Sequence, residues 1–173
     1  MESTGAAIER LIAEEEWEAA RRLIQAEIDK EPEASHWLLT RLGLTYYEQF
    51  NYQRALELSE QAFALAPDCP LVLWDYAGTL EMLDRTQEAL VIYQRIIERG
   101  IESLAYDPCG EGRARARGFY ADSLYRISHC YTALGNHAKA VEAMQSALEQ
   151  RGPGCQSIYP IGKLRKELNT LQT

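Results

Sequence analysis

Apolar residues recur three and four positions apart along most of this chain, which is the spacing of one face of an α-helix. Short breaks rich in Gly, Pro, Asp and Asn interrupt the pattern. The pattern therefore predicts an all-α protein. We expect helices near residues 5–14, 17–30, 36–48, 52–66, 70–83, 86–99, 112–134, 137–150 and 160–172.

Alanine recurs at one position of this pattern, at Ala20, Ala55, Ala89 and Ala140. The intervals are 35, 34 and 51 residues, and 51 equals 34 plus 17. A unit of about 34 residues therefore occurs four times, with an insertion of 17 residues before or inside the fourth copy.

The second unit has the most complete motif, Leu39-x2-Leu42-Gly43-x2-Tyr46-x8-Ala55-x3-Ser59-x2-Ala62-x4-Pro67. It resembles the tetratricopeptide-repeat pattern W-x2-L-G-x2-Y-x8-A-x3-F-x2-A-x4-P, and differs only where Leu39 and Ser59 replace the aromatic residues. The resemblance implies a single domain over residues 1–173, a right-handed α-α superhelix (solenoid). Its expected parts are repeats at about 1–34, 36–69, 70–103 and 121–154, an insertion at 104–120 and a capping helix at about 160–172.

Particular residues predict where these helices cross and end. Gly43, Ala77 and Ser128 are small where two helices should cross closely, as are the recurring alanines. Proline and glycine should end the second helices, and Asp84 with Gln87 has the spacing of a capping box. The expected helix ends are at Pro32, Pro67 and the Gly152-Pro153-Gly154 run.

In the family that the chain resembles, the first helix of each repeat lines a concave groove in which peptides lie. The resemblance implies a groove that is aromatic and apolar at its centre, with acidic edges at Glu48, Glu81 and Asp122. Large aromatic side chains are common anchors of protein interfaces. The candidate partner-binding residues are Trp37, Thr40, Leu44, Tyr47, Trp74, Gly78, Met82, Asp122, Tyr125 and His129.

Two alternatives remain open for this groove. Its aromatic residues could serve packing alone, and the C-terminal helix, with the apolar stripe Ile161, Leu164, Leu168 and Leu171, could fold back into it. One branch of the family binds acidic chaperone tails through a clamp of Lys, Asn and Arg, which this chain lacks at the matching positions. We therefore expect a partner segment with apolar or aromatic anchors and basic flanks.

The insertion carries Arg113, Arg115 and Arg117 at the start of an unusually long expected helix. Cations at a helix N-terminus are slightly unfavourable, so these arginines form a possible secondary partner-binding site. A solvated loop with incidental charge is the alternative.

Charge is unevenly distributed along the chain. The net charge is −8, which disfavours nucleic acid as a partner. Residues 1–68 hold 14 acidic and 6 basic side chains, whereas residues 113–173 hold 4 acidic and 9 basic ones. A self-assembling scaffold with charge-complementary ends, a homo-oligomer, is therefore the alternative to an adaptor, scaffold or chaperone-like module for another protein.

We expect no catalysis, because the sequence holds no phosphate-binding loop, nucleophile elbow or paired-histidine motif. The four cysteines lie 21 or more residues apart without a Cys-x-x-Cys pair, so we expect no metal, and we expect no cofactor. The sequence shows no secretory signal and no apolar run that is long enough to span a membrane. We therefore expect a cytoplasmic protein.

Overall fold

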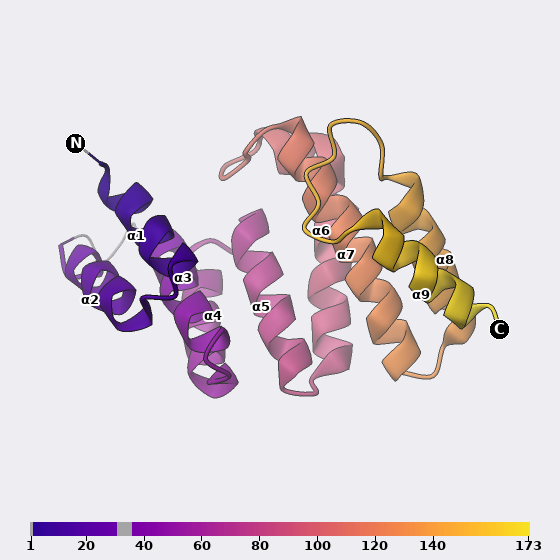
Figure 1. The fold of residues 1–173 in the computed structure, drawn as a ribbon, viewed down its shortest axis with the longest axis horizontal. Coiled ribbons are helices and arrows are strands. Elements are labelled where there is room, and N and C mark those ends of the chain that lie inside the picture. Colours follow the sequence, from indigo (N-terminus) through magenta and orange to yellow (C-terminus); the bar gives the residue numbers. More distant parts are fainter. Residues whose placement is uncertain (1, 31–35) are drawn as a thin grey trace. The chain divides into compact units, whose positions relative to one another are not determined.

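The computed structural model describes residues 2–30 and 36–173, and within these ranges the chain forms helices and no strand (Figure 1). Eight of the nine expected helices agree with the structure to within two residues at each end. Pro32, which was expected to end a helix, lies outside the described residues. The helices are α1 (Thr4–Ala13), α2 (Trp17–Ile28), α3 (His36–Tyr47), α4 (Tyr52–Leu65), α5 (Pro70–Met82), α6 (Thr86–Tyr106), α7 (Arg113–Ala133), α8 (His137–Glu149) and α9 (Ile161–Leu171).

The chain divides into two compact units, Met1–Thr79 and Leu80–Thr173, with the boundary inside α5. Unit 1 packs α1 on α2, α2 on α3, and α3 on α4. Its core includes the fully buried Ile8, Ala20 and Ile24. Gly43 brings α3 close to α4, because a Cβ there would lie 3.6 Å from the Leu58 Cβ. The small residues of the repeat therefore serve close helix crossings, as expected.

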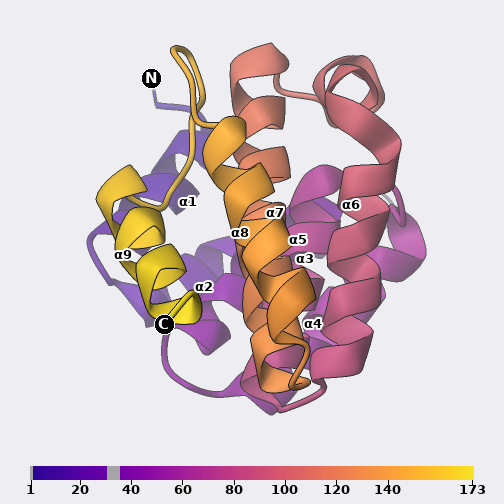
Figure 2. The ribbon, with the colours of Figure 1, turned by 90° about the vertical axis from the view of Figure 1, so that its right-hand side faces the viewer.

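Unit 2 packs α6 on α7, α7 on α8, and α8 on α9 (Figure 2). Leu164 of α9 is fully buried against Tyr125, Met144 and Ala147. The apolar stripe of α9 therefore covers the last repeat, as the capping-helix prediction required.

The turn between the two helices of each repeat holds one residue in the left-handed conformation. The φ angles are 59° at Glu15, 62° at Phe50, 58° at Asp84 and 74° at Gly135. The expected capping box at Asp84 is wrong for this reason. Asp84 ends the turn, while the N-cap of α6 is Arg85, which makes no side-chain capping hydrogen bond.

Replacing Asp84 by glycine is expected to stabilise the protein by about 1 kcal/mol, because glycine adopts positive φ without a Cβ clash. Urea denaturation followed by circular dichroism measures the change. Gly135→Ala is the reciprocal control and should destabilise by a similar amount. If Asp84→Gly lowered stability, the strain assigned to this turn would be refuted.

The helix expected over 86–99 is followed directly by a second helical stretch in the structure. Gly100 breaks the helical backbone, with φ 72° and ψ 162°, and the helix resumes beyond it through Leu104 to Tyr106. Residues 107–112 form the expected loop, and α7 then runs from Arg113 without interruption. The insertion therefore lengthens both helices of a hairpin around one short loop.

The segment between α8 and α9, residues 150–160, contains no helix, and we call it the C-terminal strap. It runs back along the start of α7 before α9 begins, as both ribbon views show (Figures 1 and 2). The Gly152-Pro153-Gly154 run lies within it, three residues beyond the last residue of α8.

Candidate functional site

The candidate residues on α3 differ in how accessible they are. Trp37 is half-buried, and its ring lies 3.7 Å from where a Cβ on Gly5 would stand. Thr40 is 1% exposed, and its hydroxyl donates to the Trp37 carbonyl oxygen at 2.7 Å. Thr40 is therefore a packing residue, contrary to the expectation that it contacts a partner.

The C-terminal end of α3 carries an aromatic group. Tyr47 packs edge-on against Tyr52 at 5.3 Å between ring centroids, and Phe50 packs edge-on against Tyr52 at 6.2 Å. Phe50 is 78% exposed. Tyr47 was among the predicted partner-binding residues and Phe50 was not. Phe50 stands where the fourth repeat has Gly135, which is an unusual place for an aromatic residue.

Three helices of unit 1 are joined by one arginine. The Arg41 guanidinium on α3 lies 3.3 Å from the Glu9 carboxylate on α1 and 3.4 Å from the Asp75 carboxylate on α5. Trp74 and Gly78 stand on α5 on either side of Asp75 and are half-buried, as is Leu44 on α3. Several of the predicted binding residues therefore lie on α3 and α5, which are the first helices of two repeats in unit 1.

The candidate residues on α7 are covered by the C-terminal segment. Tyr125 is fully buried, and its ring centroid lies 4.5 Å from that of Tyr159. Its phenol donates to the Glu167 carboxylate at 3.1 Å, and His129 Nε2 lies 2.9 Å from the other oxygen of Glu167. Burial, together with the Glu167 carboxylate, raises the pKa of the Tyr125 phenol well above its ordinary value, so the proton stays on this donor.

Tyr125 therefore does not offer its ring to a partner in this structure, which differs from the expectation. The physical reason is that α9 folds onto this face of α7, one of the two alternatives that the sequence left open. Met82, at the end of α5, is 42% exposed, so it remains accessible among the predicted residues of unit 2.

Asp122 binds the C-terminal strap, which covers it, and is not the acidic edge of a groove. It is 4% exposed and accepts hydrogen bonds from the Ile158 amide at 3.0 Å and from the Ser157 hydroxyl. The Arg151 guanidinium lies 3.6 Å away. Burial raises the pKa of the Asp122 carboxyl, and these three partners oppose that rise.

The arginines of the insertion are engaged within unit 2. Arg117 donates to the carbonyl oxygens of Pro153 at 3.0 Å and Gln150 at 3.2 Å. The Arg113 guanidinium lies 3.1 Å from the Glu102 carboxylate, and the Arg115 guanidinium lies 4.8 Å from the centre of the Phe119 ring. Arg117 therefore binds the C-terminal strap, a role that was not predicted from the sequence.

Gly118 is the closest point between the strap and α7. A Cβ on Gly118 would lie 1.9 Å from the Gln156 carbonyl oxygen, and the Gln156 amide donates to the Ala114 carbonyl oxygen at 3.1 Å. A glycine in the interior of a helix was the one sequence signal of this contact, because glycine is unfavourable there without a packing reason.

A concave pocket of about 450 Å³ lies between α7, α8 and α9. We call it the α9 pocket. Most of its surface is apolar, with the fully buried Met144 in its wall. Its lining residues are His129, Thr132, Ala133, Met144, Glu167, Thr170 and Leu171.

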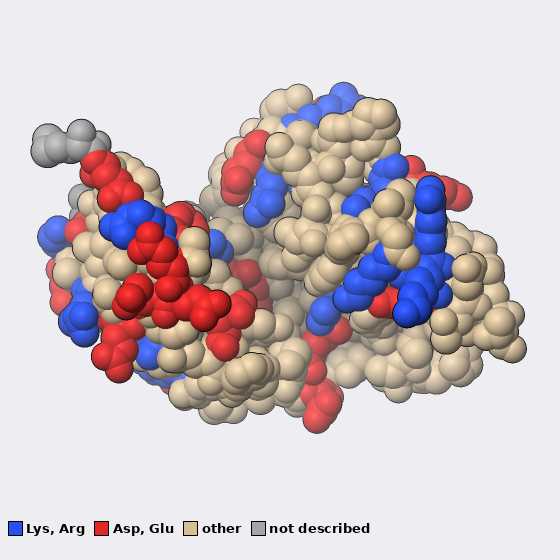
Figure 3. Space-filling view, viewed as in Figure 1, with Lys and Arg blue, Asp and Glu red and all other residues tan. Residues whose placement is uncertain are grey.

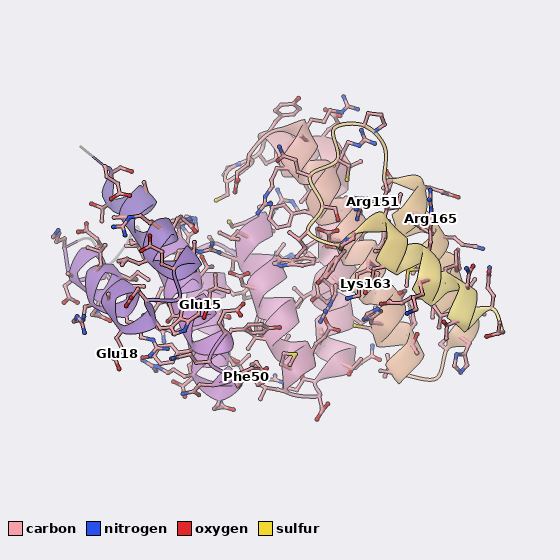
Figure 4. All side chains as sticks on the ribbon, viewed as in Figure 1. Glu15, Glu18, Phe50, Arg151, Lys163 and Arg165 are labelled. Carbon is pink, nitrogen blue, oxygen red and sulfur yellow. The ribbon has the colours of Figure 1, made fainter. Side chains whose placement is uncertain are left out.

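Basic side chains gather on the outer surface of α9. Lys163, Arg165 and Lys166 are exposed on this helix, and Figure 3 shows the basic cluster over it. Figure 4 labels Lys163 and Arg165 in this cluster and Arg151 close by in the strap. In unit 1, a cluster of acidic side chains lies over α1 and α2, where Figure 4 labels Glu15 and Glu18 (Figure 3).

Two thiols of unit 2 are held in the protonated state. Burial raises the pKa of Cys130 to about 12 and also raises the pKa of Cys155. A thiol is a nucleophile or a metal ligand mainly as the thiolate, and burial disfavours the thiolate of both cysteines.

No helix within the described residues is both long and apolar enough to cross a membrane.

The paired helices, the recurring small residues and the left-handed turn define a helical-repeat protein. The tetratricopeptide-repeat family model matches residues 46–102, and a second tetratricopeptide-repeat model matches residues 121–152. The chain belongs to the tetratricopeptide-repeat family. No curated protein sequence matches it.

Solved structures of low identity share the fold. MamA 41-end from Desulfovibrio magneticus RS-1 is 18% identical with a TM-score of 0.71, over 98% of this chain and 81% of that one. The apo form of RapI is 16% identical with a TM-score of 0.76, over 96% of this chain and 60% of that one. A tetratricopeptide-repeat protein from Parabacteroides merdae ATCC 43184 is 19% identical with a TM-score of 0.67, over 96% of this chain and 57% of that one. At these identities the likeness concerns the fold alone.

Proposed function

We propose that this protein is a non-enzymatic interaction module that binds a segment of another protein on the first helices of unit 1. The observation that supports the proposal is the packing of α9 against Tyr125 in unit 2. There the first helix of a repeat accepts an amphipathic segment, which buries Tyr159 and Leu164 against it.

Trp74 is the counterpart of Tyr125 in the third repeat. Each stands 15 residues before the recurring alanine of its repeat, Ala89 and Ala140 respectively. Trp74 is half-buried, whereas Tyr125 is fully buried. In unit 1, α5 thus carries an aromatic residue at the repeat position that holds α9 in unit 2.

Charge supports a basic partner segment. Residues 1–79 hold 15 acidic and 6 basic side chains. A segment with an apolar anchor and Lys or Arg flanks would bury its anchor near Trp74 and Leu44 and gain favourable electrostatics from the acidic surroundings.

The experiment is affinity capture from the native cell extract, followed by a titration of the captured protein into the purified full chain. Trp17, Trp37 and Trp74 all lie in unit 1, so their fluorescence reports on this unit alone. We expect binding to shift the emission, and Trp74→Ala to weaken binding at least tenfold, as is typical of an interface anchor.

Val91→Ala is the matched control, because Val91 is 55% exposed on a second helix and should leave affinity unchanged. Circular dichroism verifies that both variants are folded. A partner that binds Trp74→Ala as tightly as the wild type would place the binding site elsewhere and overturn the proposal.

A further inference from the structure

Phe50 stands out among the turn residues of the four repeats. It adopts φ 62°, a conformation that is unfavourable for a bulky side chain. It also leaves 78% of its surface in contact with water. The equivalent residues are Glu15, Asp84 and Gly135, which are polar or lack a side chain. Strain and exposed apolar area together indicate a role outside the folded monomer, because neither stabilises it.

The α9 pocket has the size and chemistry to receive such a side chain. Its volume of about 450 Å³ lies within the range of pockets that bind ligands. An aromatic ring placed there would pack against apolar side chains of the lining such as Ala133 and Leu171.

The charges around the two surfaces are opposite. Glu48 is exposed two residues before Phe50, and unit 1 has an excess of nine acidic side chains, from 15 acidic and 6 basic. On α9, the exposed Lys163 and Lys166 stand one turn before Glu167 and Thr170, which line the pocket. Figure 3 shows the acidic cluster on unit 1 and the basic cluster over α9.

We propose that this protein self-associates head to tail, with Phe50 of one copy inserted into the α9 pocket of a second copy. In this contact, Lys163 and Lys166 of the second copy lie opposite the acidic side chains around Phe50 of the first copy. Such an interface joins two different surfaces, so a pair of copies still has one free Phe50 and one free pocket for further copies. The inference uses surfaces other than those of the proposed function and is independent of it.

The test is light scattering on the full chain over a range of concentrations, with two single variants that each remove one side of the contact. Phe50→Ala removes the inserted ring, and Ala133→Glu places a carboxylate in the pocket. Both residues are exposed, so the fold should persist, and circular dichroism verifies this. We expect the wild type to associate in the micromolar-to-millimolar range typical of small interfaces, and each variant to associate at least tenfold more weakly.

Mixing the two variants distinguishes this contact from other modes of association. Phe50→Ala retains an intact pocket, and Ala133→Glu retains an intact Phe50, so an equimolar mixture should form a dimer that grows no further. A mixture that stays monomeric, or a wild type that stays monomeric at millimolar concentration, would overturn the inference.

Two lysine variants test the electrostatic part with equal changes of net charge. Lys166→Glu should weaken self-association at least tenfold, while Lys139→Glu, on α8 beside a different groove, should leave it unchanged. Equal effects of the two variants would contradict the docking site. Trp74→Ala should leave self-association intact, so failure of this inference and failure of the proposed function are distinguishable.

Discussion

Gly118→Ala is expected to destabilise the protein by about 3 kcal/mol, the upper part of the usual range for overpacking. The new Cβ would lie 1.9 Å from the Gln156 carbonyl oxygen and 2.6 Å from its carbon, and both are backbone atoms that cannot rotate away. The C-terminal strap must then move off α7. Asp122 would lose the Ile158 amide and the Ser157 hydroxyl, leaving a buried carboxylate with fewer partners. Urea denaturation followed by circular dichroism measures the loss.

Gly162→Ala is the matched control, because both glycines lie in helices. No atom lies within 4 Å of the position of a Cβ on Gly162, so alanine should stabilise by up to about 1 kcal/mol through helix propensity. A Gly118→Ala protein as stable as the wild type would show that the strap does not rest on α7 in solution.

The fold was predicted well from residues whose position within the repeat determines what they contact. The recurring alanines are at most 1% exposed, because they stand where helices cross, and that requirement is visible in the spacing alone. The end predicted for the helix at 86–99 agrees with the break in helical backbone at Gly100, which has φ 72° and ψ 162°. The helical stretch that follows this break was not predicted, and it buries Leu104 and Ala105.

The site was harder to predict because its residues are decided by contacts distant in sequence. Asp122 and Tyr125 have the spacing of groove residues, but partners more than 30 residues away, Ile158 and Glu167, cover them. Repeat spacing carries no information about where a C-terminal segment folds. Phe50 was missed for a different reason, since the left-handed turn position is known only from the backbone conformation.

The insertion and the C-terminal strap contact each other in unit 2. The first turns of α7 supply Arg117, Gly118 and the Ala114 carbonyl oxygen, all of which contact the strap. The strap in turn leads directly into α9, whose Glu167 binds Tyr125 and His129. The 17 additional residues therefore position the helix that covers the last repeat and forms one wall of the α9 pocket.

Glu81→Ala is expected to destabilise the protein by about 3–5 kcal/mol, the range observed when one partner of a buried ion pair is removed. The Glu81 carboxylate lies 2.6 Å from Arg126 Nη2 and 2.7 Å from Arg126 Nε, and it accepts a hydrogen bond from the phenol of the buried Tyr93 at 2.7 Å. The side chains of Glu81 and Arg126 are only 12% and 20% exposed. Without the carboxylate, the Arg126 guanidinium and the Tyr93 phenol lose this hydrogen-bond acceptor, and little water reaches them to replace it. The midpoint of urea denaturation measures the loss.

A double variant and a surface pair separate the buried charge from ordinary ion pairing. Glu81→Leu combined with Arg126→Met removes both charges, so it should recover most of the stability that Glu81→Ala loses. Glu88→Ala breaks the Arg85–Glu88 pair, which is equally short at 2.7 Å, but its side chains are 36% and 57% exposed. That loss should be a small fraction of the loss from Glu81→Ala, because water screens and solvates the separated charges. Equal losses for Glu81→Ala and Glu88→Ala would mean that water reaches the Glu81–Arg126 pair in solution.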